Sequence, residues 1–476
     1  MNRDILRRIL GLFTVFACSG CALVQPTDPY RATGIQMSAV SERQAGLPSA
    51  KHSEGPLDLP QAITIALVNN PDIATASWDA EAAKAQHDLA FGERLPSLRV
   101  VGGYTHYNDP QRLIAKRGEA APGPFQNDPG EFSRDIVSGD LVLSMPLFTG
   151  GRLVNQVKAA ELLQKAADHR LARSREEIIF NVSSVFSNIL AQKRVVESLE
   201  FSRQTIEEHL NRVGALVTAQ KAAKVDQIRT EVRLADIKQR VVREKNVMSV
   251  QHRILANFLG LKNSAESPSI RGDLVLEQKV AVPNIEKLLA KAWTKRDDYL
   301  AARSALEAQA RSVDAASAGH WPTLSLQGAY GERQAKGSPS GYGSESDNVG
   351  RFGIVLDFPL FEGGRVKARI SDQRAKLASA QERFRKLGLQ IRLDVETALL
   401  NVNSSQERIE VIKKAIEQAL ESLRIERLKY DSGKGAIVDV LDAQSALLDS
   451  QTNYDRALAD YNIALAQLRL AIGGEL

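Results

Sequence analysis

Few side chains in this sequence have types and spacings suited to chemistry. The seven histidines are scattered, and no phosphate-binding loop, nucleophile elbow or Cys/His pair occurs. Asp439 and Asp442 stand out because residues three apart lie on one face of a helix, where two carboxylates can attract a cation together. The simpler explanation is that acidic residues in a first helical turn suit the helix macrodipole. The sequence therefore predicts a protein that is not an enzyme, with no cofactor and no metal site.

Composition narrows the class of protein further. The chain carries a net charge of +5, with basic and acidic residues interleaved and no basic stripe, so nucleic acid is not an expected partner. No apolar run reaches 18 residues, and the sequence therefore predicts no transmembrane helix.

The two cysteines of the chain, Cys18 and Cys21, end an N-terminal secretory signal. Arginines among the first eight residues precede an apolar run over 9–17. Ser19-Gly20-Cys21 resembles a bacterial lipobox, so we predict a signal peptide over 1–20, lipidation at Cys21 and a surface tether over 21–56. Ala22 after the cysteine, in place of Asp, implies sorting to the outer membrane. A plain signal peptide and lipidation of Cys18 are the alternatives.

A seven-residue phrase occurs twice and reveals an internal repeat. Pro146-Leu-Phe-Thr-Gly-Gly-Arg152 returns as Pro359-Leu-Phe-Glu-Gly-Gly-Arg365, an offset of 213 residues. Proline cannot donate to a strand ladder, and paired glycines let the backbone turn, so the phrase predicts a junction from strand to helix. The junction residues are Pro146, Gly150, Gly151, Pro359, Gly363 and Gly364. We therefore expect repeat 1 over 57–260, a connector over 261–284 and repeat 2 over 285–476.

Four segments before these phrases alternate apolar and polar residues. They lie at about 97–108, 135–146, 323–332 and 349–359, and each keeps its phase between the repeats. This pattern is typical of transmembrane β-strands, although a half-buried soluble sheet would show it as well. Four strands cannot close a barrel, and open edges do not occur in lipid, so the chain is expected to oligomerise. Two copies would give a filled eight-stranded barrel, whereas three copies would give twelve strands and an opening.

Long helices follow each phrase. Residues 152–213 contain neither Gly nor Pro, and 365–432 contain only Gly388. Each run would span roughly 90–100 Å and must pack in coiled-coil seams. A second helix follows at about 225–259 and at 437–472. The turn between them is marked by Gly433 and Gly435 in the second copy, but residues 219–222 contain no helix breaker, so that turn is predicted from the repeat alone.

The duplicated helix-strand-strand-helix-helix unit, the junction phrase and the lipobox resemble the bacterial outer membrane efflux protein family, the TolC-like channels of lipoprotein type. The sharpest match is Tyr430…Gly433…Val438-Asp-Val-Leu-Asp-Ala-Gln444, which is similar to the family's tip motif. The resemblance implies a homotrimer with a twelve-stranded transmembrane β-barrel in the outer membrane, continuous with a periplasmic α-helical barrel. It also implies a periplasmic adaptor and an inner membrane transporter of RND or ABC type as partners.

The same resemblance assigns a gate to the periplasmic tip. Its turn is formed by Tyr430, Gly433, Lys434 and Gly435, and Asp439 and Asp442 match the paired gate aspartates. Some family members carry an arginine where this chain has Gly435, so that latch does not carry over. Asp226 is the first-repeat counterpart of Asp439.

Two other functions are compatible with these features. One is the exit duct of a type I protein secretion system, and the other is a lipid-anchored periplasmic coiled-coil adaptor without a pore. An adaptor would not contain two hairpins flanked by membrane-type strands. The transported substrate is not encoded in any residue pattern.

Overall fold

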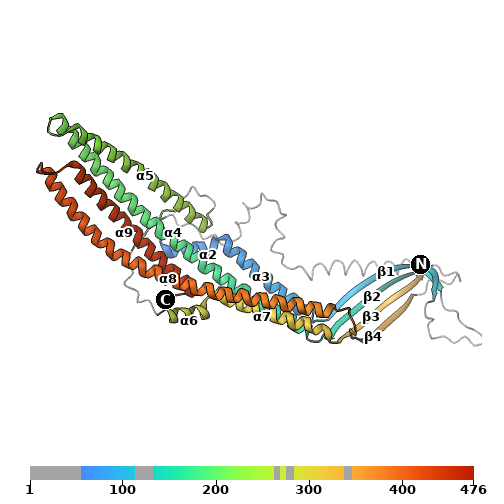
Figure 1. The fold of residues 1–476 in the computed structure, drawn as a ribbon. Helices are drawn as coiled ribbons and strands as arrows, with labels where there is room; N and C mark the ends of the chain where they lie inside the picture. Colours follow the sequence, from blue (N-terminus) through green and yellow to red (C-terminus); the bar gives the residue numbers. More distant parts are fainter. Residues whose placement is uncertain (1–54, 113–131, 262–267, 275–283, 337–345, 476) are drawn as a thin grey trace, which may run out of the picture. The chain divides into compact units, whose positions relative to one another are not determined.

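The computed structural model describes residues 55–112, 132–261, 268–274, 284–336 and 346–475 (Figure 1). The predicted signal peptide, Cys21 and nearly all of the tether lie outside these residues. Repeat 1 contains α2 (Leu59–Asn69), α3 (Pro71–Gly92), β1 (Ser97–Arg112), β2 (Phe132–Phe148), α4 (Arg152–Thr218) and α5 (Lys224–Phe258). Repeat 2 contains α6 (Ile285–Lys295), α7 (Asp297–Ser317), the 3₁₀ turn η3 (Ala318–His320), β3 (Thr323–Lys336), β4 (Ser346–Asp357), α8 (Arg365–Asp431) and α9 (Ile437–Ile472). The two halves therefore have the same order of elements.

The described residues form two compact units that do not coincide with the repeats. One unit contains 86–159 and 310–375, and the other contains 55–85, 160–309 and 376–475 within the described ranges. Each unit thus takes elements from both repeats. Two tandem domains, each folded from one repeat, are excluded by this division.

The four strands form one antiparallel sheet in the order β1-β2-β3-β4, seen side by side in Figure 1. Leu143 is opposite Leu98 on one side and Gly328 on the other. Leu326 is opposite Ile354. The apolar positions read from the sequence therefore share one face across all four strands, and Ile354 is 62% exposed on it. Such a face needs an apolar surrounding outside the single chain.

The strands differ in length from those expected. β1 reaches Arg112 and β3 reaches Lys336, both beyond the predicted ends, whereas β4 ends at Asp357. The expectation that proline closes each strand is wrong for Pro146, because β2 continues to Phe148. The register shifts between Pro146 and Phe148, and an irregularity of this kind accommodates a residue without an N–H.

The paired glycines at both strand-helix junctions adopt left-handed backbone conformations. The φ angles are +64° and +87° at Gly150 and Gly151, and +59° and +81° at Gly363 and Gly364. Only glycine adopts such angles without a steric cost. A β-carbon on Gly150 would also lie 2.6 Å from Cβ of Trp321, whereas one on Gly363 would meet no atom within 4 Å. The first junction is therefore more tightly packed than the second.

The helical unit has its main apolar core where α2, α4, α5, α6, α8 and α9 meet. The core includes Val182, Val395, Leu255 and Leu468, all nearly inaccessible to solvent. Arg296, which is 4% exposed, extends the contact between α6 and α9 because its Nη1 donates to the carbonyl of Ala471 at 3.3 Å. Within the described residues, none of the helices is both long enough and apolar enough to cross a bilayer.

Candidate functional site

The candidate site lies at the turns of two helical hairpins, α4–α5 (hairpin 1) and α8–α9 (hairpin 2). Both turns close with the same pair of hydrogen bonds. In hairpin 2 the Gly433 N–H donates to Tyr430 O and the Lys434 N–H to Lys429 O, each at 2.9 Å. In hairpin 1 Gln220 and Lys221 donate to carbonyls at the equivalent positions, at 3.0 and 2.8 Å. Each helix therefore ends in a Schellman motif, which needs one left-handed residue.

The left-handed residue of the Schellman motif is Gln220 in hairpin 1 and Gly433 in hairpin 2. Their φ angles are +57° and +74°, and Gln220 is the one residue other than glycine with positive φ in the described chain. The first turn therefore forms as the repeat predicted, although it contains no glycine. Its conformation is strained because a side chain in this region meets its own backbone.

Gly435 is required by a close approach within the second turn. A β-carbon there would lie 2.9 Å from Cβ of Lys429 and 3.0 Å from N of Tyr430. An arginine at this position would force the turn to shift. The structure thus gives a local reason for glycine at this position.

Asp439 and Asp442 both lie on the exposed side of the start of α9. Val440, Leu441 and Ala443 between and beside them are buried in a small core under the turn. Neither aspartate forms an ion pair with a described residue of the same chain. The two carboxylates are therefore free to face a neighbouring molecule or an opening.

The first repeat offers a weaker counterpart. Asp226 lies in the first turn of α5 and is half-buried, and the position three residues later is Arg229. Only hairpin 2 therefore places two acids on one face.

Tyr430 packs between the hairpins. Its ring centroid lies 5.8 Å from that of His209 on α4. Burial raises the pKa of the Tyr430 hydroxyl, and the nearby carboxylates of Asp226 and Asp431 raise it further. The hydroxyl therefore stays protonated at neutral pH.

His209 is not among the site residues predicted from the sequence, although its position on α4 carries a signal. It belongs to a stripe on α4 in which spacings of four and three alternate: Val195, Leu199, Ser202, Ile206, His209 and Val213. Such a stripe is a coiled-coil seam, so a histidine within it is placed for burial. Its partner could not be predicted, because Tyr430 lies on a helix of the other repeat.

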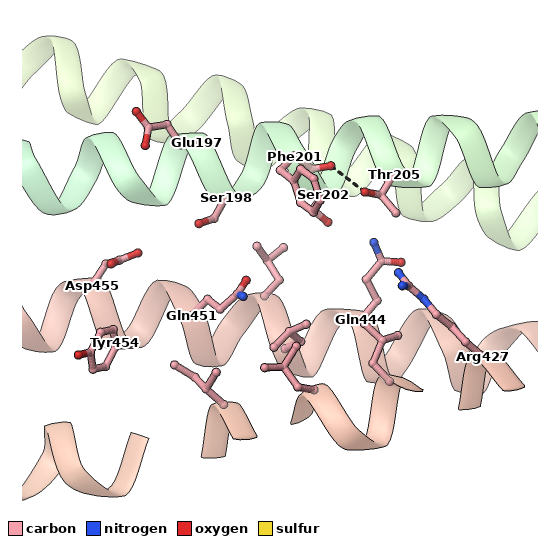
Figure 2. Close-up of a pocket in the computed structure, with 15 residues that line it drawn as sticks. Glu197, Ser198, Phe201, Ser202, Thr205, Arg427, Gln444, Gln451, Tyr454 and Asp455 are labelled. Carbon is pink, nitrogen blue, oxygen red and sulfur yellow. Dashed lines mark hydrogen bonds between the residues drawn. The ribbon is translucent and has the colours of Figure 1, made fainter. Parts of the chain in front are cut away.

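A groove of 730 Å³ is lined by residues of α4, α8 and α9 (Figure 2). Phe201, Ser202 and Thr205 line it from α4, and Gln444 and Gln451 face them from α9. Asp455 lies at one end of the groove, where burial raises the pKa of its carboxyl despite the nearby Arg194. The two hairpins are thus not fully packed against each other along this stretch.

Comparison with known proteins agrees with this architecture. A family model described as "Outer membrane efflux protein" matches residues 62–261 and 288–474. The outer membrane protein TolC of Vibrio cholerae serotype O1 is 22% identical over 412 residues, which cover 85% of this chain and 88% of the relative. The probable outer membrane lipoprotein SilC of Salmonella typhimurium is 22% identical over 483 residues, covering 96% of this chain and 98% of the relative.

Solved structures show the same fold. The outer membrane protein VceC from Vibrio cholerae superposes with a TM-score of 0.73 at 19% identity, covering 88% of this chain and 96% of that one. The outer-membrane channel OprN gives a TM-score of 0.73 at 20% identity, covering 87% and 90%. The family model matches both repeats, from within α2 to just beyond the end of α9, and the chain therefore belongs to the outer membrane efflux protein family.

Proposed function

We propose that this outer membrane protein is the exit duct of a tripartite efflux system, assembled as a homotrimer. The observation that carries the proposal is the sheet. It has one apolar face, and its edge strands β1 and β4 each have an outer edge without a partner among the described residues. Along the chain, β2 is followed by α4 and β4 by α8, and each of these helices has 67 residues. A helix of that length spans about 100 Å, which suits passage across a periplasm.

The number of chains in the assembly follows from the need to close the sheet into a barrel. Unpaired strand edges are not tolerated in lipid, so β1 of one copy must pair with β4 of the next. Three copies give twelve strands, the smallest closed number that leaves an opening along the axis. The apolar face then contacts lipid, and the polar face lines the lumen.

The duct needs partners to move substrates. A periplasmic adaptor and an inner membrane transporter, of RND or ABC type, would deliver substrate to the hairpin turns and open them. Cys21 would carry the lipid that anchors the N-terminus in the outer membrane.

The turns of hairpin 2 would form the gate. Three copies of Asp439 and Asp442 would place six carboxylates around one opening. Such a ring concentrates cations where water is excluded and Coulomb interactions are strong. The resting channel is therefore cation-selective and is blocked by multivalent cations from the periplasmic side.

Planar-bilayer recording tests both the pore and the gate. Purified protein should show a small cation-selective conductance that trivalent cations block. The double variant Asp439→Ala with Asp442→Ala should lose most of this block, whereas Asp226→Ala, the matched change in repeat 1, should keep it. Unchanged block in the double variant would show that these aspartates serve only the helix start. A protein that gives no conductance and is not a trimer in outer membrane extracts would be an adaptor instead.

A further inference from the structure

The stripe on α4, whose apolar residues pack mainly with α5 and reach α9 at Leu448, contains two polar positions with an atom that lacks a hydrogen-bond partner among the described residues. Of the six stripe residues on α4, the four apolar ones are nearly inaccessible to solvent. The other two are Ser202 and His209. Oγ of Ser202 and Nε2 of His209 are both buried, and neither forms a hydrogen bond with any described residue. His209 is half-buried as a whole, but its Nε2 atom has no acceptor among the described residues for a proton.

The surroundings of His209 come from both hairpins. It shares a pocket of 250 Å³ with Val440 and with charged and polar residues of α4, α8 and α9: Thr205, Glu208, Arg212, Arg427, Tyr430, Asp431 and Gln444. Arg212 belongs to hairpin 1 and Arg427, labelled in Figure 2, to hairpin 2. On α5, Asp226 acts on the Tyr430 hydroxyl. The imidazole therefore shares this pocket with one guanidinium group from each hairpin, and the charge of Asp431 opposes part of their effect.

These surroundings disfavour a charged imidazole. Burial lowers the pKa of His209, the charges of Arg212 and Arg427 lower it further, and Asp431 partly opposes them. The ring is neutral at neutral pH and packs on Tyr430 at a centroid distance of 5.8 Å.

We propose that His209 is an acid-sensitive latch between the two hairpins of each chain, which packs on Tyr430 when neutral and releases hairpin 2 when protonated. The proposal deepens the gating part of the proposed function and rests on it. A proton on Nε2 of the imidazolium would be buried without an acceptor among the described residues, and the ring would add a positive charge near Arg212 and Arg427. Separation of the hairpins exposes the ring to water and takes Arg427 of α8 away from it, whereas Arg212 stays on the same helix as His209.

The direction of the pH effect follows from linkage. The pKa of His209 is lower in the packed state than in water, so the packed contact has its full stability above the ordinary histidine pKa. That stability declines as the pH falls below this value, because the separated state binds the proton more tightly. Mild acid therefore favours the open tip.

The first test is the open-channel current of reconstituted wild-type protein at about pH 7.5 and about pH 5.5, on either side of the ordinary histidine pKa. We expect a roughly threefold or larger rise in open probability in acid. His209→Gln keeps a polar side chain of similar size that cannot become charged, and it should remove the acid-induced rise in open probability. His209→Lys carries a fixed charge and should be open at both pH values.

His252→Gln is the matched control. His252 is also on hairpin 1, but its Nδ1 lies 2.9 Å from the Met248 carbonyl of its own helix. This variant should respond to acid as the wild type does. An acid response that persists in His209→Gln would overturn the proposal, because the proton would then act elsewhere.

A second test does not depend on conductance. Spin labels on Lys221→Cys and Ser432→Cys, both at exposed turn positions, report the distance between the hairpins. The parent chain, treated in parallel, controls for labelling at Cys18 or Cys21. The distance should increase in acid in the wild-type background and not with His209→Gln. A distance independent of pH would overturn the latch, whereas acid-dependent separation in a protein without conductance would support the latch and refute the channel.

Discussion

Alanine at the equivalent glycines Gly150 and Gly363 should have unequal effects, although the two positions have the same sequence context. Both have positive φ, at +64° and +59°, so alanine costs about 1–2 kcal/mol at either site from the left-handed conformation alone. At Gly363 no other atom lies within 4 Å of the new methyl group.

At Gly150 the methyl group would also lie 2.6 Å from Cβ of Trp321 and 2.9 Å from the Ala318 carbonyl oxygen. Overpacking of this kind adds about 1–3 kcal/mol, because the junction must move to make room. We therefore expect a total loss of about 2–5 kcal/mol for Gly150→Ala, against about 1–2 kcal/mol for Gly363→Ala.

The assay is thermal unfolding of the detergent-extracted protein, followed by circular dichroism at the helical band, with the yield from outer membranes as a second readout. Gly150→Ala should have the lower midpoint and the lower yield. Equal midpoints, or a larger loss for Gly363→Ala, would refute the reasoning, since the contacts of a single chain would then not determine the cost.

Three further outcomes are expected. Leu143→Arg and Ile354→Arg place a charge on the apolar face of the sheet. Each should lower the free energy of unfolding by about 2–4 kcal/mol and reduce the amount of trimer recovered from membranes, whereas Ser325→Arg on the opposite face should have a mild effect. Equal tolerance of all three substitutions would contradict the assignment of the faces. Gln220→Gly relieves the strained turn of hairpin 1 and should raise the free energy of unfolding by about 1 kcal/mol in denaturant titrations, with no gain if another residue limits that turn. Cys21→Ser should abolish labelling by a fatty-acid analogue while leaving the oligomer intact, and labelling that persists would move the lipid to Cys18.

Much of the fold could be predicted from residue types. The phase of the strands follows from alternation, and the sheet register places Leu98, Leu143 and Ile354 on one face as expected. The family assignment from the tip motif is confirmed by the family match.

Other features depend on packing between distant segments and leave no local trace. The approach of Gly150 to Trp321 joins residues from different repeats, and so does the ring contact of His209 with Tyr430. The division into units also crosses the repeats, because strands pair with strands and helices with helices. The resemblance to the family predicts Asp439 and Asp442 as gate residues, and the structure adds that both lie on an exposed side of α9.

The two edge strands, β1 and β4, also determine how mutations in this gene would behave in a cell that carries a normal copy as well. Each subunit of a closed ring depends on two neighbours for its edges, because β1 and β4 each have an outer edge without a partner strand among the described residues of the chain. A variant that folds but has a damaged strand edge would assemble into rings together with normal subunits and inactivate those rings, so the mutation should be genetically dominant. A variant that fails to fold never reaches a ring and should be recessive. Dominance would thus separate assembly defects from folding defects without any purification.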